Sequence, residues 1–204
     1  ANNVSLGRGS LLVNTTGSNN VAVGYNALTS NTTGDKNICL GSNAGGNITT
    51  GSNNTCIGDD AGTTGTPPGN ITTQSDHVAL GNNDTTWIGG KVSFTSTSDK
   101  RDKADITDFT AGLSWINKLR PVTYRWDMRS DYSEDLSVTP DGTHKRTKLN
   151  LGLIAQEELE IEKEHGYANS KDDMLITDEN NEGNYTMKYE RLVPVLVNAV
   201  KELS

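Results

Sequence analysis

Hydrophobic and polar positions in the first half of the chain follow a short repeating phrase. It consists of an asparagine, an aliphatic or β-branched residue, a small residue, a second aliphatic residue and a glycine. Copies occupy residues 3–7, 20–24, 37–41 and 54–58, so the start advances by 17 residues each time, and a less regular fifth copy covers residues 77–81. Alternation predicts one short strand per copy, and the surrounding Gly and Asn residues supply tight turns. A fixed period predicts stacked units that share one core.

Each predicted strand has a face of larger side chains and a face of smaller ones. Val21 and Val23 point one way and Ala22 the other, because side chains alternate along a strand. The small side chains permit close packing, either inside a solenoid or against two sister chains. Cys39 and Cys56 occupy the same small position, and we interpret them as small buried residues rather than as a redox pair.

The pattern changes after residue 97, where helical periods and charged residues appear. The polar stretch at residues 130–145 is expected to be an exposed hairpin or loop with a turn at 140–142, and another turn is expected at 180–183. Residues 98–204 are therefore predicted to form a small α+β domain with a C-terminal helix. The expected helices cover residues 109–119, 156–165 and 192–203, and the expected strands cover residues 122–126, 149–155, 174–177 and 185–189.

The last predicted helix carries a wide apolar stripe. This helix tolerates Pro194 only if the proline lies in its first turn. The stripe is wide enough to pack on its own domain and on copies of the chain, and the sequence leaves core packing and a shared three-chain bundle equally open. The apolar residues are Leu192, Val193, Leu196, Val197, Val200 and Leu203.

Composition favours a chain that assembles with copies of itself. Hydrophobic residues make up 32% and aromatic residues 5% of the sequence, so one copy has little apolar surface to bury, and oligomerisation or stacking is expected. The net charge of -8 disfavours a nucleic-acid partner, which requires a basic face. No apolar run reaches the length of a membrane span, so no membrane insertion is expected. Two cysteines are too few for a disulfide framework or a structural zinc site, and no metal or cofactor is predicted.

Four motifs follow the repeats. They lie, in chain order, at residues 98–103, 119–126, 152–157 and 189–197. Together they resemble the intramolecular chaperone of phage tailspikes and tail fibres, the S74 peptidase family that is also found in endosialidases. The family signature Ser-Asp-x-Arg-x-Lys is matched at each fixed position by Ser98, Asp99, Arg101 and Lys103. The resemblance implies a domain that drives trimerisation of the fibre and then removes itself by cutting between Thr97 and Ser98.

The repeat phrase resembles the head repeats of trimeric autotransporter adhesins and related segments of viral fibres. This resemblance implies a trimeric β-roll or β-prism. The expected organisation is therefore a repetitive β-rich fibre or stalk segment at residues 1–97, followed by a C-terminal chaperone domain at residues 98–204.

The chemistry of the cut requires a base, because a serine hydroxyl is a poor nucleophile until it loses its proton. The histidines, His77, His144 and His165, lie in no recognisable catalytic context, and we interpret them as isolated surface or turn residues. A lysine serves as base only after burial or nearby cations have favoured its neutral form, and Lys103 is the candidate partner of Ser98.

Spacing constrains this pair. Five residues of extended chain span about 17 Å, whereas base and nucleophile must come within about 3 Å. Either the chain turns between Ser98 and Lys103, or the lysine comes from a neighbouring protomer, and both possibilities are open. Asp99 and Arg101 are expected to shape the turn or to hold the scissile carbonyl, and Arg101 is a possible cationic neighbour of the lysine.

The sequence thus predicts the C-terminal part of a phage-type tail fibre or tailspike, made in the host cytoplasm and carried on the virion. The expected assembly is a homotrimer, the expected reaction is a single-turnover self-cleavage by a Ser-Lys dyad, and the fibre part is a candidate for binding a host surface receptor. One alternative is a trimeric adhesin or fibre tip that stays uncleaved and binds a receptor. A membrane-bound transcription factor with the same self-cleaving domain is a second alternative, which the neutral repeats disfavour.

Overall fold

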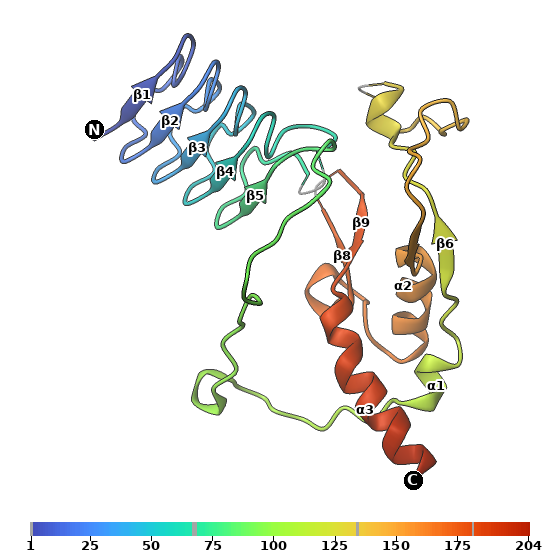
Figure 1. Cartoon of the computed structure of the whole chain (residues 1–204). Coiled ribbons are helices and arrows are strands. Elements are labelled where there is room, and N and C mark those ends of the chain that lie inside the picture. The colour runs from blue at the N-terminus through green and yellow to red at the C-terminus, as the bar shows by residue number, and fades with distance from the viewer. Residues whose placement is uncertain (1, 67–68, 134, 181) are drawn as a thin grey trace. The chain divides into compact units, whose positions relative to one another are not determined.

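The structure is a computed structural model that describes residues 2–66, 69–133, 135–180 and 182–204. Pro67 and Pro68 of the long connector and Asn181 of the predicted turn lie outside the described residues. Figure 1 shows a repetitive sheet in the first part of the chain and a mixed helical and β region in the second. A β-rich repeat followed by a small α+β region with a C-terminal helix agrees with the predicted fold class.

The chain divides into two compact units whose segments interleave. The first unit consists of residues 1–86, 125–148 and 180–184, and the second of residues 87–124, 149–179 and 185–204. A stretch from the middle of the second half of the sequence therefore belongs to the unit that contains the repeats. The functional boundary that the sequence suggests between residues 97 and 98 stays a prediction.

The repeats form a parallel β-solenoid. Its five strands pair in chain order to make one sheet, and each residue faces the equivalent residue of the next repeat, as Val4 faces Val21 and Ile38 faces Thr55. Figure 1 shows the strands as successive rungs. One short strand per repeat was predicted and is confirmed. The strands are β1 (Val4–Leu6), β2 (Val21–Val23), β3 (Ile38–Leu40), β4 (Thr55–Ile57) and β5 (Val78–Leu80).

The small middle residue of strands β2 to β5 points into the solenoid. Ala22, Cys39, Cys56 and Ala79 are fully buried and pack with aliphatic residues from the turns, such as Ile48. The sequence left two places open for the small face, and the structure puts it inside the solenoid. Both cysteines are buried free thiols, which agrees with their interpretation as small buried residues.

The two outer residues of these strands face away from the core. Because the strands are in register, their side chains stack into two parallel rows on the outside of the sheet. We call this surface the outer solenoid stripe. Its most exposed aliphatic members are Val4, Leu6, Ile38, Leu40, Ile57, Val78 and Leu80.

A ladder of buried asparagines explains why the phrase begins with Asn. Asn20, Asn37 and Asn54 are fully buried. The side-chain oxygen of Asn20 accepts the backbone N–H of Asn37 at 2.9 Å, and that of Asn37 accepts the N–H of Asn54 at 3.0 Å. The amide nitrogen of Asn37 donates to the carbonyl of Gly51 at 2.8 Å. Each asparagine therefore satisfies backbone groups that the narrow core would otherwise leave unpaired.

The second unit is built from three helices and two antiparallel strand pairs. Its core contains Trp115, Ile161, Ile176 and Val195. Strands β6 and β7 pair, and so do β8 and β9. The helices are α1 (Leu113–Ile116), α2 (Ala155–Glu164) and α3 (Leu192–Leu203), and the strands are β6 (Val122–Tyr124), β7 (Asn150–Gly152), β8 (Thr177–Glu179) and β9 (Tyr185–Met187).

The helix predicted at residues 109–119 is wrong over most of its length, since α1 covers only four residues. Gly112 lies against α3, where an added Cβ would meet the backbone of Asn198 and Ala199 at 2.7 and 2.6 Å. The side chain of Asn198 also donates to the carbonyl of Phe109 at 2.6 Å. Packing against α3 therefore holds residues before α1 in a non-helical conformation, overriding their apolar period.

The final helix is confirmed, and its apolar residues divide into two sets. Pro194 lies in the first turn of α3, where no backbone N–H is required. Leu192, Val195 and Ala199 are buried in the domain. A second set, which we call the α3 stripe, stays exposed and consists of Val193, Leu196, Val197, Val200 and Leu203.

The described residues of 125–148, which exclude residue 134, have little regular structure, in line with the predicted hairpin or loop. Among them, one turn of 3₁₀ helix covers Arg129–Asp131. Gly142, in the predicted turn, has φ +91°. Within their unit they contact the end of the repeats, where Asn83 donates to the hydroxyl of Ser130 at 2.6 Å.

Candidate functional site

Residues 98–103 form a tight turn that brings the predicted dyad together. Asp99 caps a short 3₁₀ helix at Lys100–Asp102, and its carboxylate accepts the backbone N–H of Arg101 at 2.9 Å. The backbone N–H of Lys103 donates to the carbonyl of Lys100 at 3.2 Å, which closes the turn. As a result, Lys103 Nζ lies 2.7 Å from Ser98 Oγ. Of the two arrangements that the sequence allowed, the turn within one chain accounts for this contact.

Asp99 and Arg101 pair with each other beside the dyad. Arg101 Nη2 lies 2.6 Å from Asp99 Oδ2, and Arg101 Nε also donates to this carboxylate. These hydrogen bonds lower the pKa of Asp99 and raise that of Arg101. The pairing offsets the charge of Arg101, which weakens its expected effect on Lys103. Asp99 therefore caps the turn and the side chain of Arg101 pairs with Asp99, while the roles predicted for the two residues in the site stay predictions.

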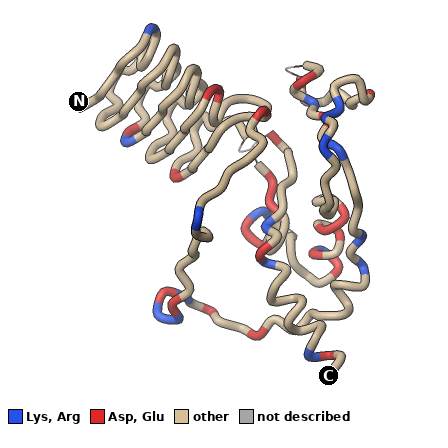
Figure 2. Tube along the Cα trace, viewed as in Figure 1, with Lys and Arg blue, Asp and Glu red and all other residues tan. Residues whose placement is uncertain are grey.

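The site is open to solvent in a single chain. Thr97, Ser98 and Lys103 are all exposed, and Figure 2 shows the turn as a loop that carries both basic and acidic residues. The geometry therefore brings the amine of Lys103 to the hydroxyl of Ser98 in a turn that is open to solvent in the single chain.

The structure also brings a second serine, Ser114, into contact with a histidine, which was not predicted from the sequence. His165, predicted to be isolated, lies with Nε2 3.2 Å from Ser114 Oγ and Nδ1 2.8 Å from the carbonyl of Ile161. Its ring stacks on Trp115 with centroids 4.7 Å apart. Because a carbonyl oxygen only accepts, Nδ1 carries the hydrogen in its contact with Ile161. The two residues are 51 positions apart, and no local pattern connects them.

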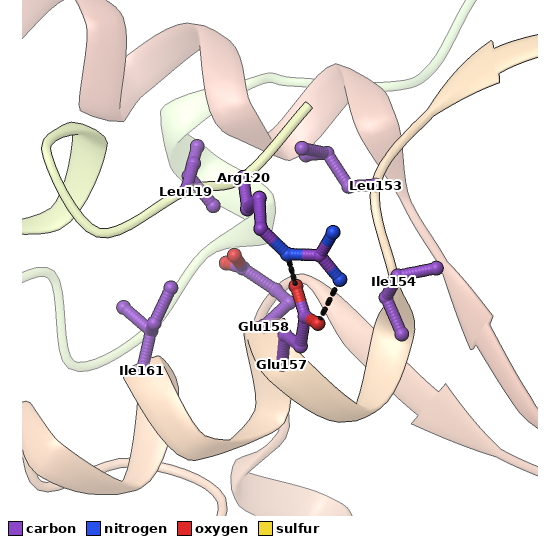
Figure 3. Close-up of a pocket in the computed structure, with 7 residues that line it drawn as sticks. All are labelled: Leu119, Arg120, Leu153, Ile154, Glu157, Glu158 and Ile161. Carbon is purple, nitrogen blue, oxygen red and sulfur yellow. Dashed lines mark hydrogen bonds and ion pairs between the residues drawn. The ribbon is translucent and has the colours of Figure 1, made fainter. Parts of the chain in front are cut away.

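Residues from three of the four motifs meet at the start of α2. Arg120 and Glu157 form an ion pair over a hollow too narrow to admit water, which Figure 3 shows with its lining side chains. The pairing raises the pKa of Arg120. The hydroxyl of Tyr189 accepts the backbone N–H of Leu153 at 2.9 Å. These contacts therefore join residues of three motifs on the surface of the domain. The hollow is lined by Leu119, Arg120, Leu153, Ile154, Glu157, Glu158 and Ile161.

Two glutamates of α2 are buried and differ in their partners. Glu162 accepts the backbone N–H groups of residues 175–177 at 2.6–3.0 Å and also the hydroxyl of Thr177. Glu158 accepts the indole N–H of Trp115 at 2.8 Å, while its other oxygen has no partner among the described residues. Burial raises the pKa of Glu158, and the nearby charge of Glu162 adds to the shift.

Glu162 also explains why β8 begins later than predicted. The strand was expected at residues 174–177 and is found at Thr177–Glu179. The preceding N–H groups are used by the carboxylate of Glu162 instead of a neighbouring strand.

Among the residues that the structure describes, no group of three or more His, Cys, Asp or Glu side chains is arranged to hold a metal ion. Within the same residues, none of the helices has the length and hydropathy needed to span a membrane.

Comparison with known proteins gives one match. No curated protein and no solved structure matches this chain. Residues 98–167, which begin at Ser98 and contain the whole Ser98–Lys103 turn, match the family model described as chaperone of endosialidase, in the peptidase S74 group. This match implies, at a coarse level, a self-cleaving peptidase, and it fits the chaperone domain of a phage tail fibre. The part of the chain that carries the candidate dyad is therefore similar to the chaperones of endosialidases.

Proposed function

We propose that this chain is the C-terminal part of a phage-type tail fibre or tailspike. The segment from Ser98 onward gathers three copies of the chain and then releases itself by cutting the bond between Thr97 and Ser98. The observation that carries the proposal is the 2.7 Å contact between Lys103 Nζ and Ser98 Oγ, directly beside the bond to be cut. The family match over residues 98–167 supports it independently.

The proposed reaction uses Lys103 as base and Ser98 as nucleophile. Neutral Lys103 takes the hydroxyl proton, and Ser98 Oγ attacks the carbonyl carbon of Thr97. The C–N bond then breaks, the nitrogen of Ser98 takes a proton, and Thr97 is left as an ester on Oγ. Water hydrolyses the ester, which gives a carboxylate on Thr97 and restores the hydroxyl of Ser98. Contact between the base and the hydroxyl favours this acyl shift over direct attack by water.

Two uncovered apolar surfaces support the proposed homotrimer. In the α3 stripe, Val193, Leu196, Val200 and Leu203 follow the three- and four-residue spacing of a coiled-coil seam, and they are 48–74% exposed. The outer solenoid stripe presents two rows of aliphatic side chains, on a scale that usually marks an interaction surface. Association of three chains would cover both.

Assembly also supplies what the isolated site lacks. Ser98 and Lys103 are exposed in one chain, and contact with neighbouring chains would desolvate the lysine and favour its neutral form. Cutting would then follow trimerisation. Once the chaperone segment is gone, the fibre cannot retrace its folding path, and its stability becomes kinetic. The mature fibre part would be carried on the virion, where attachment to a host receptor remains a prediction.

Mass spectrometry of the purified chain tests the cut. The wild type is expected to give two fragments that meet at Thr97–Ser98, and Ser98→Ala and Lys103→Ala are expected to stay intact. Lys100→Ala is the matched control, because Lys100 is an exposed lysine of the same turn. Full cutting of Lys103→Ala would contradict the role of Lys103. An intact wild type would favour the alternative of a fibre tip that stays uncleaved.

Mixed trimers decide whether the dyad acts within one chain. Chains with Ser98→Ala and chains with Lys103→Ala are mixed, so that each lacks one partner. A dyad within one chain predicts no cutting at any mixing ratio. Cutting of the Lys103→Ala chains in the mixture would show that the lysine reaches the serine of a neighbouring chain.

A further inference from the structure

The segment just before the proposed cut exposes large apolar side chains. Trp87 is 78%, Val92 83% and Phe94 93% exposed, and Ile88 is exposed as well. We call residues 87–97 the pre-cut segment. In a soluble protein, a cluster of such residues usually marks a surface that another molecule covers.

The backbone of the pre-cut segment is equally uncovered. No helix or strand includes it, and in the described part of the chain no backbone–backbone hydrogen bond holds residues 87–97. Every residue from 87 to 97 is exposed. A stretch whose amide groups and apolar side chains both lack partners has the properties of an unpaired strand.

The residue pattern is that of a strand with one apolar face. Val92 and Phe94 alternate with Ser93 and Thr95, and β-branched and aromatic residues favour extended structure. Lys91 is the single charged residue of the pre-cut segment. Copies of this segment can therefore approach one another with little electrostatic repulsion, and Phe94 can pack against its equivalents.

We propose that the pre-cut segment pairs with the same segment of two other copies of this chain, with Val92 and Phe94 packed together between the strands. The inference rests on the proposed homotrimer, which would hold three such segments at high effective concentration. The segment follows β5, the last strand of the solenoid, whose Val78 and Leu80 also face outward.

This pairing gives the cut fibre a closed end. Cutting makes Thr97 the carboxyl-terminal residue of the fibre part, so the pre-cut segment becomes its last stretch. With the strands paired, the three chains remain joined beside their new ends. Without pairing, each would end in a solvated chain that exposes Trp87 and Phe94.

Cysteine cross-linking in the uncut Ser98→Ala chain tests the arrangement. Phe94→Cys and Ser96→Cys lie on the proposed inner face, and Thr95→Cys lies on the opposite face. Under mild oxidation by a copper complex, two thiols on neighbouring chains lose two protons and two electrons and form a disulfide. We expect covalently linked chains from positions 94 and 96 and a several-fold lower yield from position 95. The native Cys39 and Cys56 are buried and should not react.

The outcomes separate this inference from the proposed function. The oligomeric state of each sample is measured by sedimentation before oxidation. A trimer that gives no links, or equal links at positions 94, 95 and 96, overturns the pairing of the pre-cut segment and leaves the homotrimer standing. A single chain in sedimentation overturns both.

A stability measurement gives a second readout. In the cut protein, Phe94→Ser is expected to lower the melting temperature of the fibre part, because it removes the central apolar contact. Thr95→Ala is the control on the opposite face and should leave the melting temperature unchanged. Equal melting of Phe94→Ser and wild-type fibre parts would contradict the inference.

Discussion

Replacing Leu196 and Val200 together by glutamate is expected to abolish the association of three chains. Both side chains belong to the α3 stripe, and neither is part of the buried set that packs α3 on its own domain. The two substitutions leave the domain core intact and place charges in the centre of the proposed seam, so they test the interface without unfolding the domain.

The magnitude follows from the exposure of the two side chains. Leu196 is 48% and Val200 66% exposed in a single chain, and complete burial of such a residue contributes about 1.5–3 kcal/mol. Covering the exposed fractions would therefore contribute about 2–3 kcal/mol per chain, or roughly 6–9 kcal/mol for a trimer. At 1.4 kcal/mol for each factor of ten, the association constant should fall by at least about four orders of magnitude.

Sedimentation velocity of the Ser98→Ala chain, which keeps the molecule uncut, measures this effect. The double variant is expected to sediment as a single chain at concentrations where the parent is a trimer. Lys201→Glu serves as the control, because it adds negative charge to the same helix outside the stripe and should leave the trimer intact. Circular dichroism checks that α3 remains folded.

Two results would refute the reasoning. One is a double variant that associates as strongly as the parent, which would show that the α3 stripe is not in the interface. The other is a parent that sediments as a single chain, because then no interface exists for the substitutions to break.

Three further predictions concern the folded chain. Glu162→Gln is expected to lower the stability of the folded chain by about 2–4 kcal/mol in thermal melting, because an amide NH₂ would face a buried backbone donor. The control Glu160→Gln changes an exposed side chain and should cost less than about 0.5 kcal/mol. Equal melting temperatures of the two variants would contradict this prediction. Burial raises the pKa of Glu158 above its ordinary value near 4.5, so the folded state holds its proton to higher pH than the unfolded state, and stability falls as the pH rises from about 4.5 through the raised pKa. Melting curves at pH 4 and pH 7 should therefore show that the stability of Glu158→Gln relative to the wild type is higher at pH 7 than at pH 4. The same stability difference at both pH values would contradict this prediction. Asn37→Ala should lower the free energy of unfolding in urea by about 2–4 kcal/mol, because it leaves a buried N–H of the next turn and a buried carbonyl without partners. A loss below about 0.5 kcal/mol would argue against the asparagine ladder.

The sequence predicted those parts of the fold that repeat or that depend on neighbouring residues. The period of 17 residues located the first four solenoid strands, the phrase at residues 77–81 located the fifth, and the apolar period of residues 192–203 located α3. The spacing of Ser98 and Lys103 showed that a turn was needed if one chain was to hold both. A capping aspartate two residues before Arg101 provides that turn through local hydrogen bonds.

Features that depend on distant residues could not be predicted. The predicted helix begins only after Gly112 because α3 lies against this glycine, and this contact joins positions nearly 90 residues apart. The pair of Ser114 and His165 likewise forms only when α2 packs on Trp115. In each case tertiary contacts outweigh the local pattern.

The asparagine ladder also determines how the length of the solenoid can change. Consecutive rungs are linked over 17 residues, yet the last link, from Asn54 to His77, spans 23 residues and keeps the same register of strands. The strand register is thus kept although the connector before His77 is six residues longer (23 minus 17). Whole units can therefore be added or removed in steps of about 4.8 Å, and connectors can be lengthened, without redesign of the core. A solenoid built this way can vary in length while each rung stays the same.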